Sequence, residues 1–265
     1  MKAKKSLGQN FLKSNLVINK IVEAGRISEK DFILEIGPGK GALTEKLLAE
    51  VVSKKAKCII AVEKDDELIY ELKKKFAAKI DDKKLILIKD DILKFDIHKY
   101  IGENKYKIIA NIPYNITGAI LRKFLTAKDQ PIDMILMVQH EVAKRILAKD
   151  GKESILSISV KAYGEPKMIT KVPARYFSPS PKVDSAVIAI RNISRKNFSF
   201  IESVEENDKE EKFWNIIHAG FAHKRKKLSS NLKSIFSDKK EYLEELKNKT
   251  AEELKLEDWI TLPFL

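Results

Sequence analysis

Short apolar runs alternate with amphipathic helical runs from about residue 14 to residue 150, and this alternation restricts the folds open to the chain. Five runs are rich in aliphatic and β-branched residues: FILEI (32–36), CIIAVE (58–63), LILIK (85–89), KIIAN (107–111) and MILMVQ (134–139). The stretches between them, such as ALTEKLLAEVV and DDELIYELKKKF, carry apolar residues at helical spacing. Because a helix between two strands is a crossover that leaves them parallel, the sequence predicts an α/β fold with a doubly wound, mainly parallel sheet.

The pattern of alternating strands and helices ends before the C-terminal part of the sequence. KMITKV and VDSAVIAI read as two further strands, separated by PARYFSPSPK (173–182), in which three prolines are expected to exclude regular structure. Beyond Arg191 the pattern is helical and dense in charge. We therefore expect a sheet domain over 1–192 and a small all-helical domain over 193–265.

Composition narrows the classes of partner. The 51 Lys and Arg residues exceed the 38 Asp and Glu residues, and a net charge of +13 suits a polyanion such as nucleic acid. Apolar runs stay well short of the roughly 20 residues of a membrane span, so we expect a cytoplasmic protein without a membrane partner. The single cysteine, Cys58, lies in an apolar run, and the four scattered histidines show no metal-ligand spacing, so no metal is expected.

The first strand runs into a glycine-rich turn and a helix, FILEIGPGKGALTEKLL. This arrangement brings backbone N–H groups and a helix N-terminus close to a ligand. Gly37, Gly39 and Ala42 satisfy the dinucleotide pattern G-x-G-x-x-A, whereas Glu35 with Gly37, Gly39 and Gly41 satisfies the pattern of S-adenosylmethionine (SAM) sites. The chain after residue 140 lacks a second mononucleotide half, which disfavours a dinucleotide.

Carboxylates follow the next two strands. Glu63 ends the second strand, where a carboxylate can accept hydrogen bonds from both hydroxyls of a ribose. Asp91, in the pair Asp90-Asp91 after the third strand, can accept from an adenine amine. Each is also open to a structural interpretation, Glu63 as a solvated strand end and the Asp pair as a helix cap. Their order along successive strand ends favours a ligand, because ligands bind outside the carboxyl ends of such strands.

The fourth strand ends in NIPYNIT (111–117). Asn111 supplies an amide, Pro113 fixes the local backbone, and Tyr114 offers a flat face with a polar tip. Such a turn either closes a strand or holds a flat, polar-edged ligand such as a nucleobase.

Blocks along nearly the whole chain resemble one enzyme family. They are GQNFL (8–12), EIGPGKGALT (35–44), NIPYNIT, FSPSPKVDSAV (177–187) and GFAHKRKKLSSNL (220–232). In order and content they are similar to the small-subunit ribosomal RNA adenine N6-dimethyltransferases, the KsgA family. The resemblance implies a Rossmann-like methyltransferase sheet that uses SAM and acts as a monomer on an immature 30S-type particle. It further implies dimethylation of two adjacent adenosines in the 3′-terminal hairpin loop of the RNA.

The resemblance also implies roles for individual residues. In the NIPY turn, the Asn111 side chain and the Ile112 carbonyl would accept hydrogen bonds from the target amine, beside Pro113, and Tyr114 would stack on the base. Phe177 is a candidate for the second face of the base, or else a core plug. The implied cofactor-binding set is Asn10, Leu12, Gly37, Gly39, Glu63, Asp91 and Asn111.

The basic run Lys224, Arg225, Lys226 and Lys227 is a candidate for contact with RNA phosphates, although such runs are often only solvated. Two other functions share parts of these motifs. One is a large-subunit methyltransferase of the macrolide-resistance type, which shares NIPY. The other is a non-catalytic ribosome-assembly or transcription factor of the same fold.

Overall fold

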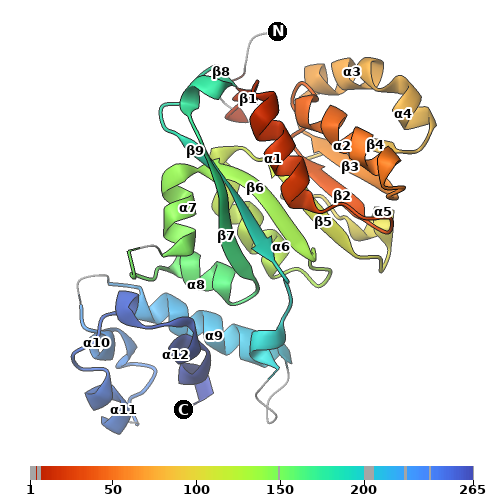
Figure 1. The fold of residues 1–265 in the computed structure, drawn as a ribbon. Helices are drawn as coiled ribbons and strands as arrows, with labels where there is room; N and C mark the ends of the chain where they lie inside the picture. Colours follow the sequence, from red (N-terminus) through yellow and green to blue (C-terminus); the bar gives the residue numbers. More distant parts are fainter. Residues whose placement is uncertain are drawn as a thin grey trace. The chain divides into compact units, whose positions relative to one another are not determined.

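The computed structural model describes residues 4, 7–148, 150–199, 206–223, 226–238 and 240–264. The chain divides into two compact units (Figure 1). The first comprises Met1–Ala143 and Glu165–Ile193, and the second comprises Lys144–Gly164 and Ser194–Leu265. Residues 144–164, which the sequence analysis assigned to the sheet domain, therefore group with the C-terminal helices. The division at residue 192 stays a prediction about domains.

A seven-stranded sheet forms the centre of the first unit, in the order β4-β3-β2-β5-β6-β9-β7. Its strands are β2 (Phe32–Ile36), β3 (Cys58–Glu63), β4 (Leu85–Lys89), β5 (Tyr106–Asn111), β6 (Asp133–Gln139), β7 (Glu165–Val172) and β9 (Ser185–Arg191). The five strands from β4 to β6 run parallel, and β9 is antiparallel to both of its neighbours. The predicted doubly wound, mainly parallel sheet is thus confirmed.

Helices lie between the strands, and two of them coincide with the predicted helical runs ALTEKLLAEVV and DDELIYELKKKF. The helices are α1 (Asn15–Gly25), α2 (Ala42–Ser53), α3 (Asp66–Lys75), α4 (Ala77–Asp81), α5 (His98–Ile101), α6 (Thr117–Leu125) and α7 (His140–Leu147). Within the described ranges, none of the helices is long and apolar enough to cross a membrane.

One apolar core joins α1 and α2 to a face of the sheet (Figure 1). Ile18 and Ile21 of α1 and Leu47 of α2 are almost fully buried in it, with Ile33 and Ile109 of the strands. Burial of each such side chain contributes roughly 1.5–3 kcal/mol to folding. The helix periodicity of these apolar residues therefore fixes which face of each helix meets the sheet.

A short second sheet corrects one prediction. β1 (Phe11–Leu12) pairs antiparallel with β8 (Phe177–Ser178), directly after a 3-10 turn, η3 (Ala174–Tyr176). The expectation that 173–182 has no regular structure was wrong. Prolines flank the pair, but Phe177 and Ser178 keep their N–H groups, and the partner strand comes from the far end of the sequence.

The second unit is helical. Its helices are α8 (Ile155–Lys161), α9 (Glu206–Gly220), α10 (Leu228–Leu232), α11 (Lys240–Glu245) and α12 (Leu256–Thr261). Two pairs of aromatic rings pack against each other in it. The ring centroids are 5.3 Å apart for Phe198 and Phe213 and 5.2 Å apart for Phe221 and Trp259. A Cβ at Gly220 would lie 2.4 Å from the Trp259 ring, so α9 approaches α12 as closely as only glycine allows.

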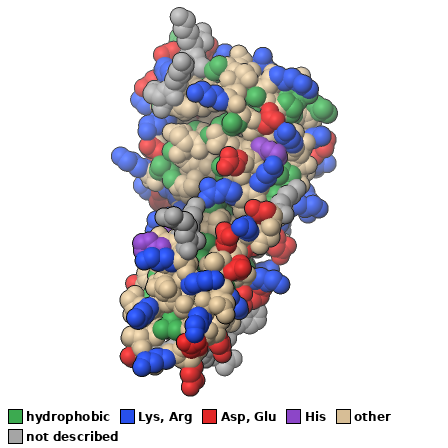
Figure 2. Space-filling view, turned by 90° about the vertical axis from the view of Figure 1, so that its left-hand side faces the viewer, with side chains coloured by type: hydrophobic (Ala, Val, Ile, Leu, Met, Phe, Trp, Pro, Cys, Tyr) green, Lys and Arg blue, Asp and Glu red, His purple; other side chains and the backbone are tan. Residues whose placement is uncertain are grey.

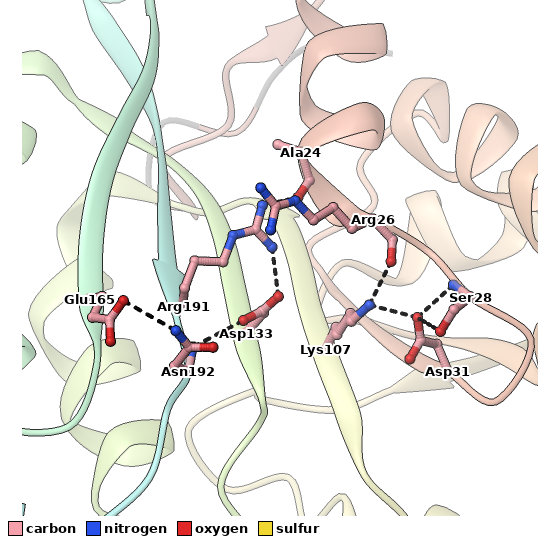
Figure 3. Close-up of polar contacts among 9 residues, drawn as sticks. All are labelled: Ala24, Arg26, Ser28, Asp31, Lys107, Asp133, Glu165, Arg191 and Asn192. Atoms are coloured by element: carbon pink, nitrogen blue, oxygen red, sulfur yellow. Dashed lines mark hydrogen bonds and ion pairs between the residues drawn. The ribbon is translucent and has the colours of Figure 1, made fainter.

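A buried and a partly buried ion pair join the amino ends of the parallel strands to neighbouring segments (Figure 3). Lys107, at the start of β5, donates to Asp31 Oδ2 and to the Arg26 carbonyl, both at 2.7 Å. Arg191 of β9 pairs with Asp133 of β6 at 2.6 Å and also donates to a backbone carbonyl of α1. These contacts lie where the parallel strands begin, at the end of the sheet opposite their carboxyl ends.

Replacing Lys107 by Met should lower the free energy of unfolding by about 3–5 kcal/mol, because it leaves the buried charge of Asp31 without its partner. The two side chains are 7% and 10% exposed. Lys79→Met, which breaks the exposed pair with Asp82, is the matched control and should cost less than about 1 kcal/mol. Denaturant unfolding measures both, and equal losses for the two variants would contradict the assigned importance of the buried pair.

Candidate active site

A cavity of about 510 Å³ opens at the carboxyl ends of the parallel strands. The segments that line it come from four successive strand ends and from the N-terminal stretch. They are residues 37–40 of the glycine turn after β2, Glu63 and Lys64 after β3, residues 90–93 after β4, the NIPY turn with Asn115 and Ile116 after β5, and residues 7–13. The predicted convergence of these motifs at one edge of the sheet is therefore present in the structure.

The glycine turn depends on backbone conformations that favour glycine. Gly37, Gly39 and Gly41 have φ values of 64°, 58° and 77°. A Cβ at Gly39 would lie 3.1 Å from the Phe11 ring, and one at Gly41 would lie 2.6 Å from the Phe76 ring. The turn therefore brings its backbone close to the N-terminal segment, and α2 begins directly after Gly41.

Glu63 is held in one orientation at the end of β3. Its carboxylate accepts hydrogen bonds from the backbone N–H groups of Gly39 (3.2 Å), Lys64 (2.9 Å) and Asp65 (3.0 Å). Burial raises its pKa, and these hydrogen bonds oppose the rise. The interpretation of Glu63 as a solvated strand end was wrong, because only 7% of the residue is exposed.

The Asp90-Asp91 pair combines a capping role with a place in the cavity wall. Asp91 Oδ1 accepts from the Leu93 N–H at 3.0 Å, and Asp90 Oδ1 accepts from the Asp91 N–H at 2.7 Å. An ion pair with Lys64 at 2.8 Å holds the pKa of Asp91 below its usual value. The role of Asp91 in binding a ligand stays a prediction.

The N-terminal stretch is tied to the start of α3. Gln9 Nε2 and Lys4 Nζ each donate to a different oxygen of Asp65 at 2.7 Å. Asn10 lies in the cavity wall, and Leu12 is buried and pairs with Phe177 in the short sheet. Sequence reasoning did not identify Asp65, although its place as the N-cap of α3 two residues after Glu63 was a usable signal.

The NIPY turn is anchored from two sides. Asn111 Nδ2 donates to the Asn10 carbonyl at 3.3 Å, and Asn111 lines the cavity. The Tyr114 hydroxyl is hydrogen-bonded to the fully buried Ser185 hydroxyl at the start of β9. Sequence reasoning missed Ser185 as this partner, although it lies within the block FSPSPKVDSAV.

The structure leaves the predictions for two groups of residues open. Phe177 is 2% exposed and packs in the apolar core, and its proposed contact with a base stays a prediction. Lys224 and Arg225 fall outside the described residues, while Lys226 and Lys227 are exposed in the second unit. Figure 2 shows Lys and Arg side chains spread over the visible face with Asp and Glu among them, so charge alone does not outline an RNA path on that face.

Two buried polar atoms test whether the cavity suits a cationic cofactor such as SAM. Within the described part of the chain, Glu35 Oε2 and Thr44 Oγ1 have no well-aligned hydrogen-bond partner, although Thr44 lies close enough to Glu35 to oppose the rise in pKa that burial causes there. Buried polar groups are normally paired, so an unpaired carboxyl oxygen in a residue that lines the cavity fits a positively charged ligand. In the same described ranges, no group of three or more His, Cys, Asp or Glu side chains is arranged to hold a metal.

Comparisons with known proteins agree with one another. The sequence model of the family described as ribosomal RNA adenine dimethylase matches residues 1–263. A curated relative from Dehalococcoides mccartyi, named ribosomal RNA small subunit methyltransferase A, is 41% identical over 98% of this chain and 87% of its own length. The protein of the same name from Fusobacterium nucleatum is 39% identical over 98% and 96%.

Solved structures share the fold. A dimethyladenosine transferase from Plasmodium falciparum has a TM-score of 0.75 and 26% identity, covering 96% of this chain and 97% of that one. The 23S rRNA methyltransferase ErmE has a TM-score of 0.74 and 23% identity, covering 96% and 98%, which is a likeness of fold alone.

Replacing Glu63 by Ala should weaken SAM binding by roughly ten- to a hundredfold, because its carboxylate is predicted to accept charge-assisted hydrogen bonds from two ribose hydroxyls. The change also removes the acceptor of three backbone N–H groups, so unfolding has to be followed in parallel with calorimetry. Glu45→Ala is the control, since it removes an equal charge from an exposed pair with Lys75. Unchanged SAM affinity in a folded Glu63→Ala protein would remove Glu63 from the site.

Proposed function

The chain belongs to the ribosomal RNA adenine dimethylase family, and from this premise we propose that it transfers methyl groups from SAM to the N6 atoms of adenosines in small-subunit ribosomal RNA. One observation carries the proposal. The glycine turn, Glu63, Asp91 and the NIPY turn line a single cavity, and this supports a cofactor site that would adjoin a site for a target amine.

The cofactor half of the cavity is assigned to the β2–β4 strand ends. Glu63 would accept from the ribose hydroxyls and Asp91 from the adenine amine, with Gly37 and Gly39 allowing the backbone to approach the ligand. Asn10 and Leu12 would close the cavity over it. When bound there, SAM supplies a methyl group that its positive sulfur already activates.

The target half of the cavity is assigned to the NIPY turn. Adenine N6 is a poor nucleophile because its lone pair is delocalised into the ring. Hydrogen bonds from the amine to Asn111 Oδ1 and to the Ile112 carbonyl would favour a pyramidal nitrogen whose lone pair is available. Pro113, with a φ of −61°, holds the two acceptors in a fixed turn. No strong base is needed, because the nitrogen becomes acidic only after it is methylated and its proton then passes to water.

Tyr114 would hold the base flat. Stacking of a base on an aromatic ring is worth roughly 1–3 kcal/mol. The Ser185 hydrogen bond fixes the ring, and burial raises the pKa of Tyr114, which keeps the phenol protonated as a partner for Ser185. Phe177 remains the proposed contact for the other face of the base.

The substrate is proposed from the relatives and from charge. The relatives named above are small-subunit methyltransferases, and a net charge of +13 suits an RNA partner. We assign the reaction to two adjacent adenosines in the 3′-terminal hairpin loop, within an immature 30S-type particle in the cytoplasm. The protein would act as a monomer, with Lys224–Lys227 contacting RNA phosphates.

The two alternative functions have less support. The likeness to ErmE is one of fold, whereas the relatives near 40% identity carry the small-subunit name. A purely structural assembly factor would have no need for Glu63 and Asn111 to line one cavity.

Asn111→Ala tests the proposal. If Asn111 tunes the target amine, methyl transfer should slow by a factor on the order of 100 or more, as expected for an interaction realised mainly in the transition state. Folding, SAM affinity and RNA affinity should change little. Single-turnover assays with saturating SAM and immature small subunits measure the rate.

Two substitutions of Tyr114 test the stacking of the target base. Tyr114→Ala should be severe because the stacking face is lost, and Tyr114→Phe should be much milder. A normal rate in Asn111→Ala would refute the proposed role of the turn.

A further inference from the structure

Two turns line the same cavity although their strands are not neighbours in the sheet. The Asp91 turn (residues 91–95) follows β4, and the NIPY turn follows β5. Strand pairing links these turns only through β3 and β2, which lie between β4 and β5. At about 4.8 Å per strand, the two strands are roughly 14 Å apart. A direct contact between the Asp91 turn and the segment that follows the NIPY turn would therefore hold the two sides of the cavity in a fixed relation.

Lys123 makes such a contact. It lies in α6, the helix that begins at Thr117 directly after the NIPY turn and the 3-10 segment η2 (Tyr114–Ile116). Its ammonium donates to the backbone carbonyls of Leu93 at 3.1 Å and of Phe95 at 2.7 Å. The helix is itself held firmly by burial of its apolar residues, Ile120, Leu121, Phe124 and Leu125.

Leu93 and Phe95 also contact Asp91 through their N–H groups. The Leu93 N–H donates to Asp91 Oδ1 at 3.0 Å, and the Phe95 N–H donates to the Asp91 carbonyl at 2.9 Å. Each of the two residues thus donates to Asp91 and accepts from Lys123. Hydrogen bonds in such a chain polarise one another, and here the chain has a carboxylate at one end and an ammonium at the other. The orientation of the Asp91 side chain is therefore tied to α6.

The second cation that holds Asp91 is the weaker restraint. Lys64, at the end of β3, pairs with Asp91 Oδ2 at 2.8 Å, but its side chain is 61% exposed. Exposed pairs of this kind contribute little. Lys123 is half-buried, and burial lowers its pKa, with the nearby carboxylates of Asp96, Asp90 and Asp91 opposing the fall. Its contacts with the two carbonyls are therefore less open to competition from water.

We propose that Lys123 is a positioning residue of the cofactor site, which acts through Leu93 and Phe95 to keep Asp91 aimed at the adenine amine of the cofactor. The inference rests on the proposed function, which assigns Asp91 to that amine. The described lining of the cavity does not include Lys123, so its effect on the cofactor is indirect.

Calorimetry of SAM binding to the full chain tests the inference with Lys123→Met, which removes the donor and keeps an unbranched side chain. SAM affinity should fall by roughly threefold to tenfold, a size typical of coupling within one hydrogen-bond network. Lys123→Arg keeps a donor and should recover most of the affinity. The Lys123→Met protein should fold, because Leu93 is 38% exposed and water can replace the ammonium there. Denaturant unfolding of each variant checks this.

Lys94→Met is the matched control. The pKa of Asp91 is lowered by Lys64 and, more weakly, by the exposed Lys94. The control variant therefore removes a cation near Asp91 but leaves both carbonyl contacts of Lys123 in place. Its SAM affinity should stay within about twofold of the wild type, because exposed charges contribute little.

A double substitution shows whether Lys123 acts through Asp91. In Lys123→Met/Asp91→Ala, SAM affinity should equal that of Asp91→Ala alone, because no carboxylate remains to be positioned. A general structural role for Lys123 would instead lower the affinity by the same factor with Asp91 present or replaced.

A pair of ligands tests the contact with the amine. S-adenosylhomocysteine carries the adenine amine, and S-inosylhomocysteine has an oxo group in its place. The wild type should bind the first more tightly by roughly tenfold or more, because the second leaves the Asp91 carboxylate without its donor. Lys123→Met should narrow this preference.

Three outcomes would overturn the inference: wild-type SAM affinity in Lys123→Met, a loss that repeats in full beside Asp91→Ala, or an unchanged preference for the adenine ligand. Each leaves the proposed function intact as long as SAM binds. Wild-type affinity in Asp91→Ala would refute the role proposed for Asp91, and the inference with it. Failure of SAM to bind the wild-type protein would overturn the proposed function itself.

Discussion

The parallel alignment of β2, β3, β4 and β5 is the constraint on which the rest of the structure depends. In register, Phe32–Ile36 of β2 faces Cys58–Val62 of β3, and Phe32–Leu34 also faces Tyr106–Ile108 of β5. Four segments that are distant in sequence therefore end at one edge, where each contributes a different chemical group. A shift of register would separate Glu63 from the glycine turn that hydrogen-bonds to it and would turn side chains to the opposite face.

The amino and carboxyl ends of these strands differ in how their charged side chains are paired. At the amino ends of the parallel strands, charges are paired, as in the buried pair of Lys107 with Asp31 and the partly buried pair of Arg191 with Asp133. At the carboxyl ends, the buried acid Glu35 has no ion-pair partner among the described residues. Paired charges hold strands in place, whereas an unpaired acid beside a cavity lowers stability until a ligand completes it. The contrast between the two ends is a physical argument for ligand binding that is independent of any resemblance.

The regular part of the fold was predictable from the sequence, and the long-range contacts were not. FILEI and CIIAVE match β2 and β3 residue for residue, because parallel strands that are buried on both faces have nearly continuous apolar sequences. The pairing of β1 with β8 was missed because two residues carry no periodicity and their partner lies more than a hundred positions away. Likewise, no local pattern links Tyr114 to Ser185, or indicates that Glu35 lacks an ion-pair partner. The sequence motifs predicted which strand ends line the cavity. Contacts between distant segments determine the hydrogen bonds that orient each side chain.

We propose that the protein transfers methyl groups from SAM to adenosines of small-subunit RNA. The most direct test supplies the protein with SAM labelled in its methyl group and with purified immature ribosomal subunits of both sizes. Digestion of the RNA to nucleosides, followed by mass spectrometry, then identifies the labelled product. The account predicts N6,N6-dimethyladenosine from the small-subunit RNA, mapped to neighbouring positions near its 3′ end. Label in large-subunit RNA, or in a nucleoside other than adenosine, would contradict it.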